Sequence, residues 1–243
     1  MGIGVLIDSI FIIKKLVFDE KCASIQQLKM QAEKDFEDAS LYNKILNLKE
    51  HYGTNSDESN HIAKDISEFI GKVITKHPID NNVVSLPGLF AFTQDIWHRN
   101  YNGTINGRKK GELLSYGIMP CATPHNDSLT EILLSCANIS TQYFPDGCPV
   151  MISLNKKDIE NNNALLSLIK TFFEVGGFHI AINTVDAKTW GLTIQVLYVL
   201  IVEKKYTVKS ILTRYASLQI PLNILAKSTL SLIIHLVKAN MKY

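Results

Sequence analysis

Apolar residues in the first third of the chain recur at helical spacing. Residues 5–18 are almost wholly apolar and predict a buried helix that begins without a capping residue. Ser24 and Gln27 have the spacing of a capping box ahead of a second helix, and residues 41–48 predict a third. Residues 57–77 place their apolar side chains on one face and predict a long amphipathic helix.

The pattern changes in the second half of the chain. Residues 150–154 predict a short strand, and residues 178–185 alternate as a second strand. Between them, residues 158–173 predict a helix that Gly176 and Gly177 end. Helices alternating with isolated strands indicate an α/β protein whose sheet or barrel is partly covered by helices.

Residues 106–134 form a long irregular stretch that leads into a helix. Glycines and prolines interrupt it at Gly107, Gly111, Gly117, Pro120 and Pro124. At its end, Ser128 and Glu131 have capping-box spacing before an apolar helix. Long loops inside compact domains are uncommon and usually functional, so this loop is the first candidate for a functional site.

Composition indicates a globular protein. The 243 residues have a net charge of +2, with 46% apolar and 20% charged residues, which fits one large domain or two small ones and gives no support for nucleic-acid binding. The four cysteines have neither zinc spacing nor a secreted framework: Cys22, Cys121, Cys136 and Cys148. With no signal-peptide pattern, a reducing, cytoplasmic setting is expected.

The last part of the chain differs in composition from the rest. Residues 191–243 combine dense apolar runs with an excess of lysine, whereas residues 1–190 have the mixed pattern described above. Pro221 and Lys227 interrupt the longest apolar run, which is too short for a membrane span of about 20 residues. We therefore expect two units, residues 1–190 and residues 191–243, and no membrane partner.

Five segments, in order, make up a family pattern. They are Ile7-Asp8-Ser9 with residues 14–21, Tyr52-Gly53, Pro87-Gly88-Leu89-Phe90, residues 106–112 with Gly117 and Pro120, and Gly176-Gly177-Phe178-His179-Ile180 with Asn183 and Val185-Asp186-Ala187. This pattern resembles the C-terminal part of the glycyl radical enzymes, the pyruvate formate-lyase family, and more closely its dehydratase/lyase branch.

The resemblance implies a ten-stranded α/β barrel built from two half-barrels. This chain would supply a helix-rich, half-barrel share of it. In the family, one loop bears a cysteine that becomes a thiyl radical and another bears the glycine that stores the radical. A radical S-adenosylmethionine iron–sulfur activase generates that radical, and no bound cofactor is expected in the chain itself.

The chain departs from the family at the cysteine. The family's cysteine loop lies upstream of the matched region, and Cys148 imitates it only superficially because it occupies a strand position and lacks the following glutamate. Free cysteines are commonly buried, so Cys148 is expected to be a small core residue. Cys121, in the long loop, is the better candidate for a reactive thiol, although a structural role is favoured for it as well.

The chain also departs from the family at the radical glycine. The family motif is close to Arg-Val-x-Gly-Tyr. Aligning on Tyr215 puts Arg214 at the glycine position, and aligning on Arg214 puts Ser217 there, while residues 192–243 contain no glycine at all. The family pattern ends abruptly after Ala187, which fits either divergence or a shifted reading frame.

The remaining site candidates are loop residues. We expect them to shape the mouth of the barrel rather than to contact substrate: Asn106, Gly107, Arg108, Gly111, Gly117 and Pro120. His179 is expected to be a satisfied core histidine. His125 has no second ligand at metal-binding spacing, so no metal site is expected.

Three functional hypotheses follow. The first is a truncated, degenerate glycyl radical enzyme that is inactive alone, on which the family activase does not act productively. It would expose apolar surface and self-associate. The second is a non-catalytic subunit that completes a partner chain supplying the rest of the barrel. The third is an unrelated α/β module that binds a small molecule and shares only local patterns.

Overall fold

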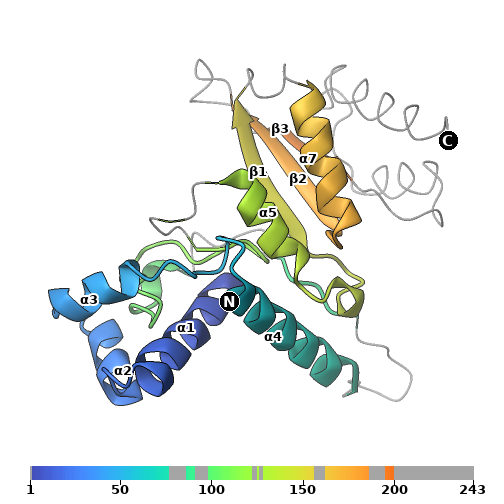
Figure 1. Ribbon diagram of the computed structural model, residues 1–243. Helices are drawn as coiled ribbons and strands as arrows, with labels where there is room; N and C mark the ends of the chain where they lie inside the picture. Colours follow the sequence, from blue (N-terminus) through green and yellow to red (C-terminus); the bar gives the residue numbers. More distant parts are fainter. Residues whose placement is uncertain are drawn as a thin grey trace, which may run out of the picture.

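The computed structural model describes residues 2–76, 86–90, 98–121, 125, 128–155, 162–185 and 195–199. Figure 1 shows a helical N-terminal part below a three-stranded sheet that has two helices on one face. The long loop runs between these two parts. The α/β class that the sequence predicts is confirmed, whereas the described strands form an open sheet, so the barrel stays a prediction.

The helix predicted over residues 5–18 is observed as α1 (Ile3–Ile13), which passes directly into a π-helical segment, Lys14–Asp19. The buried side chains of α1 recur at helical spacing and include Ile3, Ile7 and Phe11. One face of α1 packs on α4 (Asp57–Lys76). The start of α1 also contacts the loop through hydrogen bonds of Ile3 and Val5.

Side-chain caps set the starts of the next two helices. In α2 (Ile25–Glu33) the Ser24 hydroxyl accepts from the Gln27 N–H at 3.2 Å, and the Gln27 side chain accepts from the Ser24 N–H at 2.7 Å. The predicted capping box is confirmed. Helix α3 (Ala39–Leu46) begins after Asp38, whose carboxylate accepts from two backbone N–H groups of the first turn.

Small residues on α4 allow a close helix contact. Ala63, Ser67 and Gly71 are buried along one side of the helix. A Cβ atom at Gly71 would lie 2.3 Å from Cβ of Tyr143, in the 3₁₀ turn Thr141–Tyr143. Because only glycine fits there, this side of α4 is fixed against the segment that follows α5 (Leu129–Ala137).

The sheet has the order β1-β2-β3. Strand β1 (Pro149–Asn155) runs parallel to β2 (His179–Val185), and α7 (Asn162–Glu174) lies between them in the chain. Strand β3 (Gln195–Val199) pairs antiparallel with β2. The two strands predicted from the sequence and the helix between them are confirmed, while Asp158, the predicted start of that helix, lies outside the described residues.

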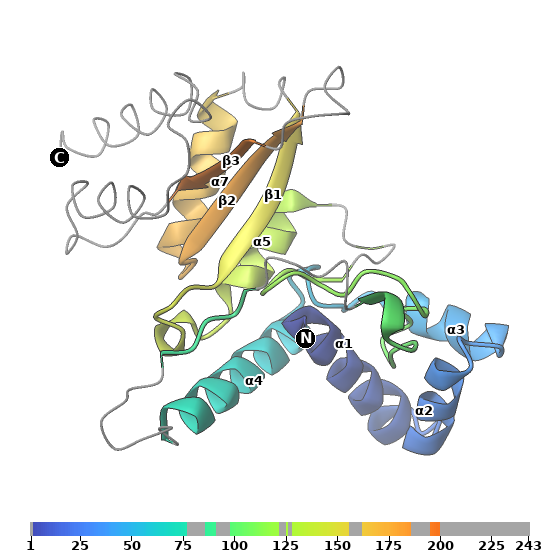
Figure 2. The ribbon, with the colours of Figure 1, turned by 180° about the vertical axis from the view of Figure 1, so that it is seen from behind.

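Helices α5 and α7 cover the same face of the sheet, as the opposite views in Figures 1 and 2 show. The core between these layers is apolar and contains Leu133, Ile169, Phe172, Val150, Ile152, Leu154, Ile180 and Ile182. Met151 and Ser153 alternate with the buried residues of β1 and face the other way, since side chains alternate along a strand.

The cap of α5 contains one of the two hydrogen bonds of the predicted capping box. The Ser128 hydroxyl accepts from the Glu131 N–H at 3.4 Å.

Tyr52 joins three separate parts of the helical layer. Its ring is fully buried, its N–H donates to Oδ1 of Asp8 on α1 at 2.8 Å, and its hydroxyl donates to the Ile118 carbonyl of the loop at 2.9 Å. Burial, followed by the nearby Cys136 thiol, raises the pKa of this hydroxyl well above its usual value, so it stays a donor.

Among the described helices, none is long and apolar enough to cross a membrane.

Tyr52→Phe is expected to lower the free energy of unfolding by about 1–3 kcal/mol, because the buried Ile118 carbonyl loses its hydroxyl donor. Urea denaturation followed by circular dichroism measures this change. Tyr101→Phe, at a half-exposed ring, is the matched control and should change stability by less than about 0.5 kcal/mol. Equal effects of the two substitutions would contradict this role of Tyr52.

Candidate functional site

The loop of residues 101–121 is held together from within by Arg108, which is buried. Its guanidinium donates to the carbonyls of Lys109 at 3.0 Å and Glu112 at 2.7 Å, and also to the carbonyl of Asn102. Its Nε donates to the Thr104 hydroxyl at 3.3 Å. Burial lowers the pKa of Arg108, but the group remains a cation at neutral pH. The guanidinium therefore organises the loop.

Asn106 links this turn to the end of the loop. Its carbonyl oxygen accepts from the Thr104 hydroxyl at 2.6 Å, and its amide donates to the Cys121 sulfur at 3.3 Å. Gly107 follows with a φ of +92°, a conformation that side chains other than glycine rarely adopt. A Cβ atom there would also lie 3.3 Å from Ile45 of α3. This turn is thus shaped against the helical layer.

The other two loop glycines also have positive φ values, of +78° at Gly111 and +49° at Gly117. No heavy atom lies within 4 Å of a Cβ atom built at Gly111, so only its backbone conformation requires glycine. At Gly117 a Cβ atom would lie 2.7 Å from the Leu89 carbonyl. Gly117 therefore allows a close contact with the segment of residues 86–90.

The start of α1 packs tightly on the same loop. A Cβ atom at Gly4 would lie 2.4 Å from the Met119 carbonyl, and the Val5 N–H donates to the Ser115 hydroxyl at 3.3 Å. The Ile3 N–H donates to the Gly117 carbonyl at 3.3 Å. Gly4 and Ser115 were not among the candidates from the sequence. The glycine at the start of an apolar helix was the signal that could have identified this contact.

A cavity of about 340 Å³ opens between the loop and the sheet. Its lining consists of residues 113–116 and 119–121 from the loop, together with Met151 and Ser153 from β1. It therefore lies on the face of the sheet opposite α5 and α7. Of the candidates from the sequence, Pro120 and Cys121 line this cavity, and Asn106 reaches it through its hydrogen bond to Cys121.

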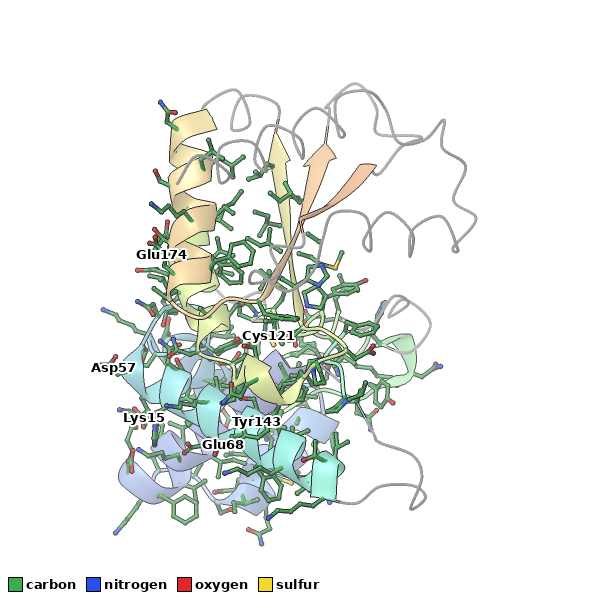
Figure 3. The ribbon with its side chains drawn as sticks, turned by 90° about the vertical axis from the view of Figure 1, so that its right-hand side faces the viewer. Lys15, Asp57, Glu68, Cys121, Tyr143 and Glu174 are labelled. Carbon is green, nitrogen blue, oxygen red and sulfur yellow. The ribbon has the colours of Figure 1, made fainter. Side chains whose placement is uncertain are left out.

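The thiol of Cys121 is kept neutral. Burial raises its pKa strongly, and the carboxylate of Asp8 raises it further. Figure 3 shows Cys121 at the junction of the sheet and the helical layer. A nucleophilic cysteine must be a thiolate, so this arrangement does not suit nucleophilic chemistry.

Cys136 and Cys148 are fully buried, and burial raises the pKa of each to about 12. The expectation that Cys148 is a small core residue is confirmed, since it lies in the cluster under the sheet. Cys22 is the exposed cysteine of the described residues. The cysteines near the loop are therefore packing residues in the folded chain.

The remaining candidates add no reactive group to the cavity. Within the described ranges, no three histidine, cysteine or acidic side chains lie together in a way that could hold a metal ion. His179 begins β2, and burial lowers its pKa. Arg214 and Ser217, the two degenerate radical-loop positions, lie outside the described residues.

Sequence reasoning missed a buried contact between a carboxylate and a histidine near Cys121. Asp8 of α1 and His51 are both fully buried, with 3.4 Å between Oδ1 and Nδ1. The available signal was an acidic residue within an otherwise apolar helix, since a buried charge requires a partner. Asp8 thus connects α1, Tyr52 and the environment of Cys121.

Comparisons with known proteins show that much of the chain is similar to part of several larger proteins. Residues 1–98 match the family described as pyruvate formate lyase-like. The chain is 28% identical over 195 residues to isethionate sulfite-lyase of Nitratidesulfovibrio vulgaris, covering 78% of this chain and 24% of that protein. It is 25% identical over 194 residues to trans-4-hydroxy-L-proline dehydratase of Clostridioides difficile, covering 76% and 24%. The chain thus spans about a quarter of the length of these curated relatives.

Solved structures share this fold. The B12-independent glycerol dehydratase from Clostridium butyricum superposes with a TM-score of 0.72 at 22% identity, over 81% of this chain and 27% of that one. A glycyl radical enzyme from Archaeoglobus fulgidus gives a TM-score of 0.69 at 21% identity, over 77% and 24%. At such identity the likeness concerns the fold.

Arg108→Met should lower the free energy of unfolding by about 2–4 kcal/mol, because three loop carbonyls lose the charged donor that holds them together and the buried side chain loses its partners. Urea denaturation monitored by tryptophan fluorescence measures the loss. Lys110→Met removes an exposed cation from the same loop and should change stability by less than about 0.5 kcal/mol. A similar loss in both variants would mean that charge, and not the hydrogen bonds, matters.

Iodoacetamide at pH 7 should modify Cys22 rapidly in the folded chain, and modify Cys121, Cys136 and Cys148 far more slowly until urea is added. Exposure favours the first thiol, while burial keeps the others protonated and inaccessible. Peptide mass spectrometry at timed intervals gives the order. Modification of Cys121 as fast as Cys22 would show that the cavity leaves its sulfur open.

Proposed function

Because this chain is related to the glycyl radical enzymes over about a quarter of their length, we propose that it forms a share of their scaffold and does no radical chemistry by itself. The parent activity would be that of the dehydratase/lyase branch, the cleavage of a carbon–oxygen, carbon–nitrogen or other bond to carbon. Relatives named as a sulfite-lyase and as dehydratases support this branch.

The observation that carries the proposal is the lack of a glycine in residues 192–243, where the radical glycine of the family would stand. A backbone radical needs a glycine because the flanking amides stabilise it and no side chain crowds it. Arg214 and Ser217, at the two aligned positions, cannot replace it. The sequence of this chain therefore lacks the residue that stores the radical.

The thiol chemistry of the described residues supports the same proposal. Hydrogen-atom transfer requires a thiol within close reach of both the radical and the substrate. Cys121 lines the cavity, but its sulfur accepts from Asn106 and is nearly fully buried. Cys136 and Cys148 are fully buried in the apolar core. The burial of all three thiols supports the proposal.

A second candidate is a complementing subunit, favoured by exposed apolar side chains beside the sheet. Leu113 lines the cavity and is 57% exposed, and Leu86 and Phe90 are exposed around Gly88, which pairs with Gly147 just before β1. Such side chains suit packing against a partner that continues the barrel. Purification of the tagged chain from its native cells distinguishes the candidates. A stoichiometric partner with a glycyl radical motif favours complementation, and recovery alone or with chaperones favours the first proposal.

The proposal predicts the outcome of anaerobic activation. Incubation of the purified 243-residue chain with a radical S-adenosylmethionine activase and S-adenosylmethionine should give no glycyl doublet in electron paramagnetic resonance. It should also give no turnover of a polyol, amine or keto acid. The related glycerol dehydratase, activated in parallel, is the positive control. A doublet from this chain alone would overturn the proposal.

A further inference from the structure

Asp8 and His51 form a buried ion pair between α1 and the turn that follows α3. Oδ1 of Asp8 lies 3.4 Å from Nδ1 of His51, and both side chains are fully buried. On the other side of the ring, Nε2 lies 3.1 Å from the Ile45 carbonyl oxygen. The edge of the Phe11 ring packs on the imidazole with a centroid separation of 5.8 Å. Each ring nitrogen therefore faces an oxygen: the Nε2 contact is a hydrogen bond, whereas Nδ1 faces the carboxylate without the geometry of a hydrogen bond.

This arrangement favours the imidazolium. A neutral histidine has one N–H and would leave one nitrogen lone pair facing an oxygen, whereas the charged ring donates from both nitrogens. Burial alone would lower the pKa of His51, but the Asp8 carboxylate and the Ile45 carbonyl outweigh it, and the pKa is raised. A buried cation is tolerated because a buried anion accompanies it.

The charged groups around the pair all favour the protonated form of His51. Asp8 of α1 and Glu50, the preceding residue, are the carboxylates that act on His51, and both favour its charged form. From α4, the Ser59 hydroxyl is uncharged and donates to the His51 carbonyl at 3.4 Å. From the loop, Cys121 faces Asp8 as a neutral thiol. Tyr52 contributes a neutral hydroxyl and its N–H.

The same carboxylate connects the pair to the cavity. Oδ1 of Asp8 accepts the Tyr52 N–H, and the Tyr52 hydroxyl holds the Ile118 carbonyl, three residues before Cys121. A change in the charge of His51 therefore acts on the residue that fixes this part of the loop. Loss of the proton would leave the buried Asp8 charge without its cation, which is strongly destabilising.

We propose that the Asp8–His51 pair is a pH-sensitive latch that keeps the loop closed over Cys121 while His51 is protonated. The stabilisation is fully present below about pH 6.5, the ordinary pKa of histidine. It is lost as pH rises through the raised pKa of the folded chain. At higher pH the loop opens locally more often and exposes Cys121. This latch does not depend on the function proposed above.

Alkylation of Cys121 relative to Cys22 tests the latch. Iodoacetamide labelling of the full chain from pH 6 to pH 9, followed by mass spectrometry, gives the ratio of the two rates, which cancels the shared dependence on hydroxide. The ratio should rise with pH in the unaltered chain, by about tenfold for each unit by which folding raises the pKa. In His51→Gln the ratio should already be high at pH 6 and should not change between pH 6 and pH 9. His61→Gln, at an exposed histidine paired with Asp65 on α4, should behave as the unaltered chain.

Two outcomes would overturn the latch: a ratio independent of pH in the unaltered chain, or the same pH dependence in His51→Gln. Nuclear magnetic resonance of chain labelled with ¹³C-histidine gives an independent answer if that variant fails to fold. We expect the His51 ring signal to titrate above about 6.5. Titration at or below that value would also refute the proposal.

Discussion

The hydrogen bond from the Tyr52 N–H to Asp8 is the contact on which the rest of the helical layer depends. It fixes a buried carboxylate in the middle of an apolar helix, and that carboxylate needs both a donor and a cation to be stable there. Through the tyrosine hydroxyl the same contact positions the loop. Helix α1, the turn and the loop therefore have to assemble together, and none of them satisfies its buried polar groups alone.

The side chains of Arg108 and Asn106 make their hydrogen bonds within the loop itself. The Arg108 guanidinium is directed at loop carbonyls, and the Asn106 amide joins a hydroxyl to a sulfur. A side chain that recognises a ligand must have donors or acceptors left for it, whereas these two have theirs directed inward. The lining of the cavity is correspondingly formed by apolar and small polar side chains. The hydrogen bonds of Arg108 and Asn106 thus fix the shape of the loop beside the cavity.

The sequence predicts what depends on local signals. The capping box at Ser24, the apolar run of α1 and the strands around α7 follow from spacing alone, and ordered motifs indicate the relation to glycyl radical enzymes, which the comparisons confirm. Contacts between distant segments could not be predicted in this way. The Asp8–His51 pair joins positions far apart in the chain, and the reason for Gly4 is a carbonyl of the loop. The half-formed cap at Ser128 shows that spacing permits a reciprocal bond without ensuring it.

A scaffold and a radical reaction place different demands on a chain. Packing needs only apolar periodicity, a few caps and glycines at positive φ, and these tolerate divergence because many side chains fill a core equally well. Radical storage needs one glycine, and no other residue offers an uncrowded backbone carbon. A chain that diverges can therefore retain its fold, as the TM-score of 0.72 at 22% identity illustrates. The described core meets the demands of packing, since its thiols are enclosed and burial keeps them neutral.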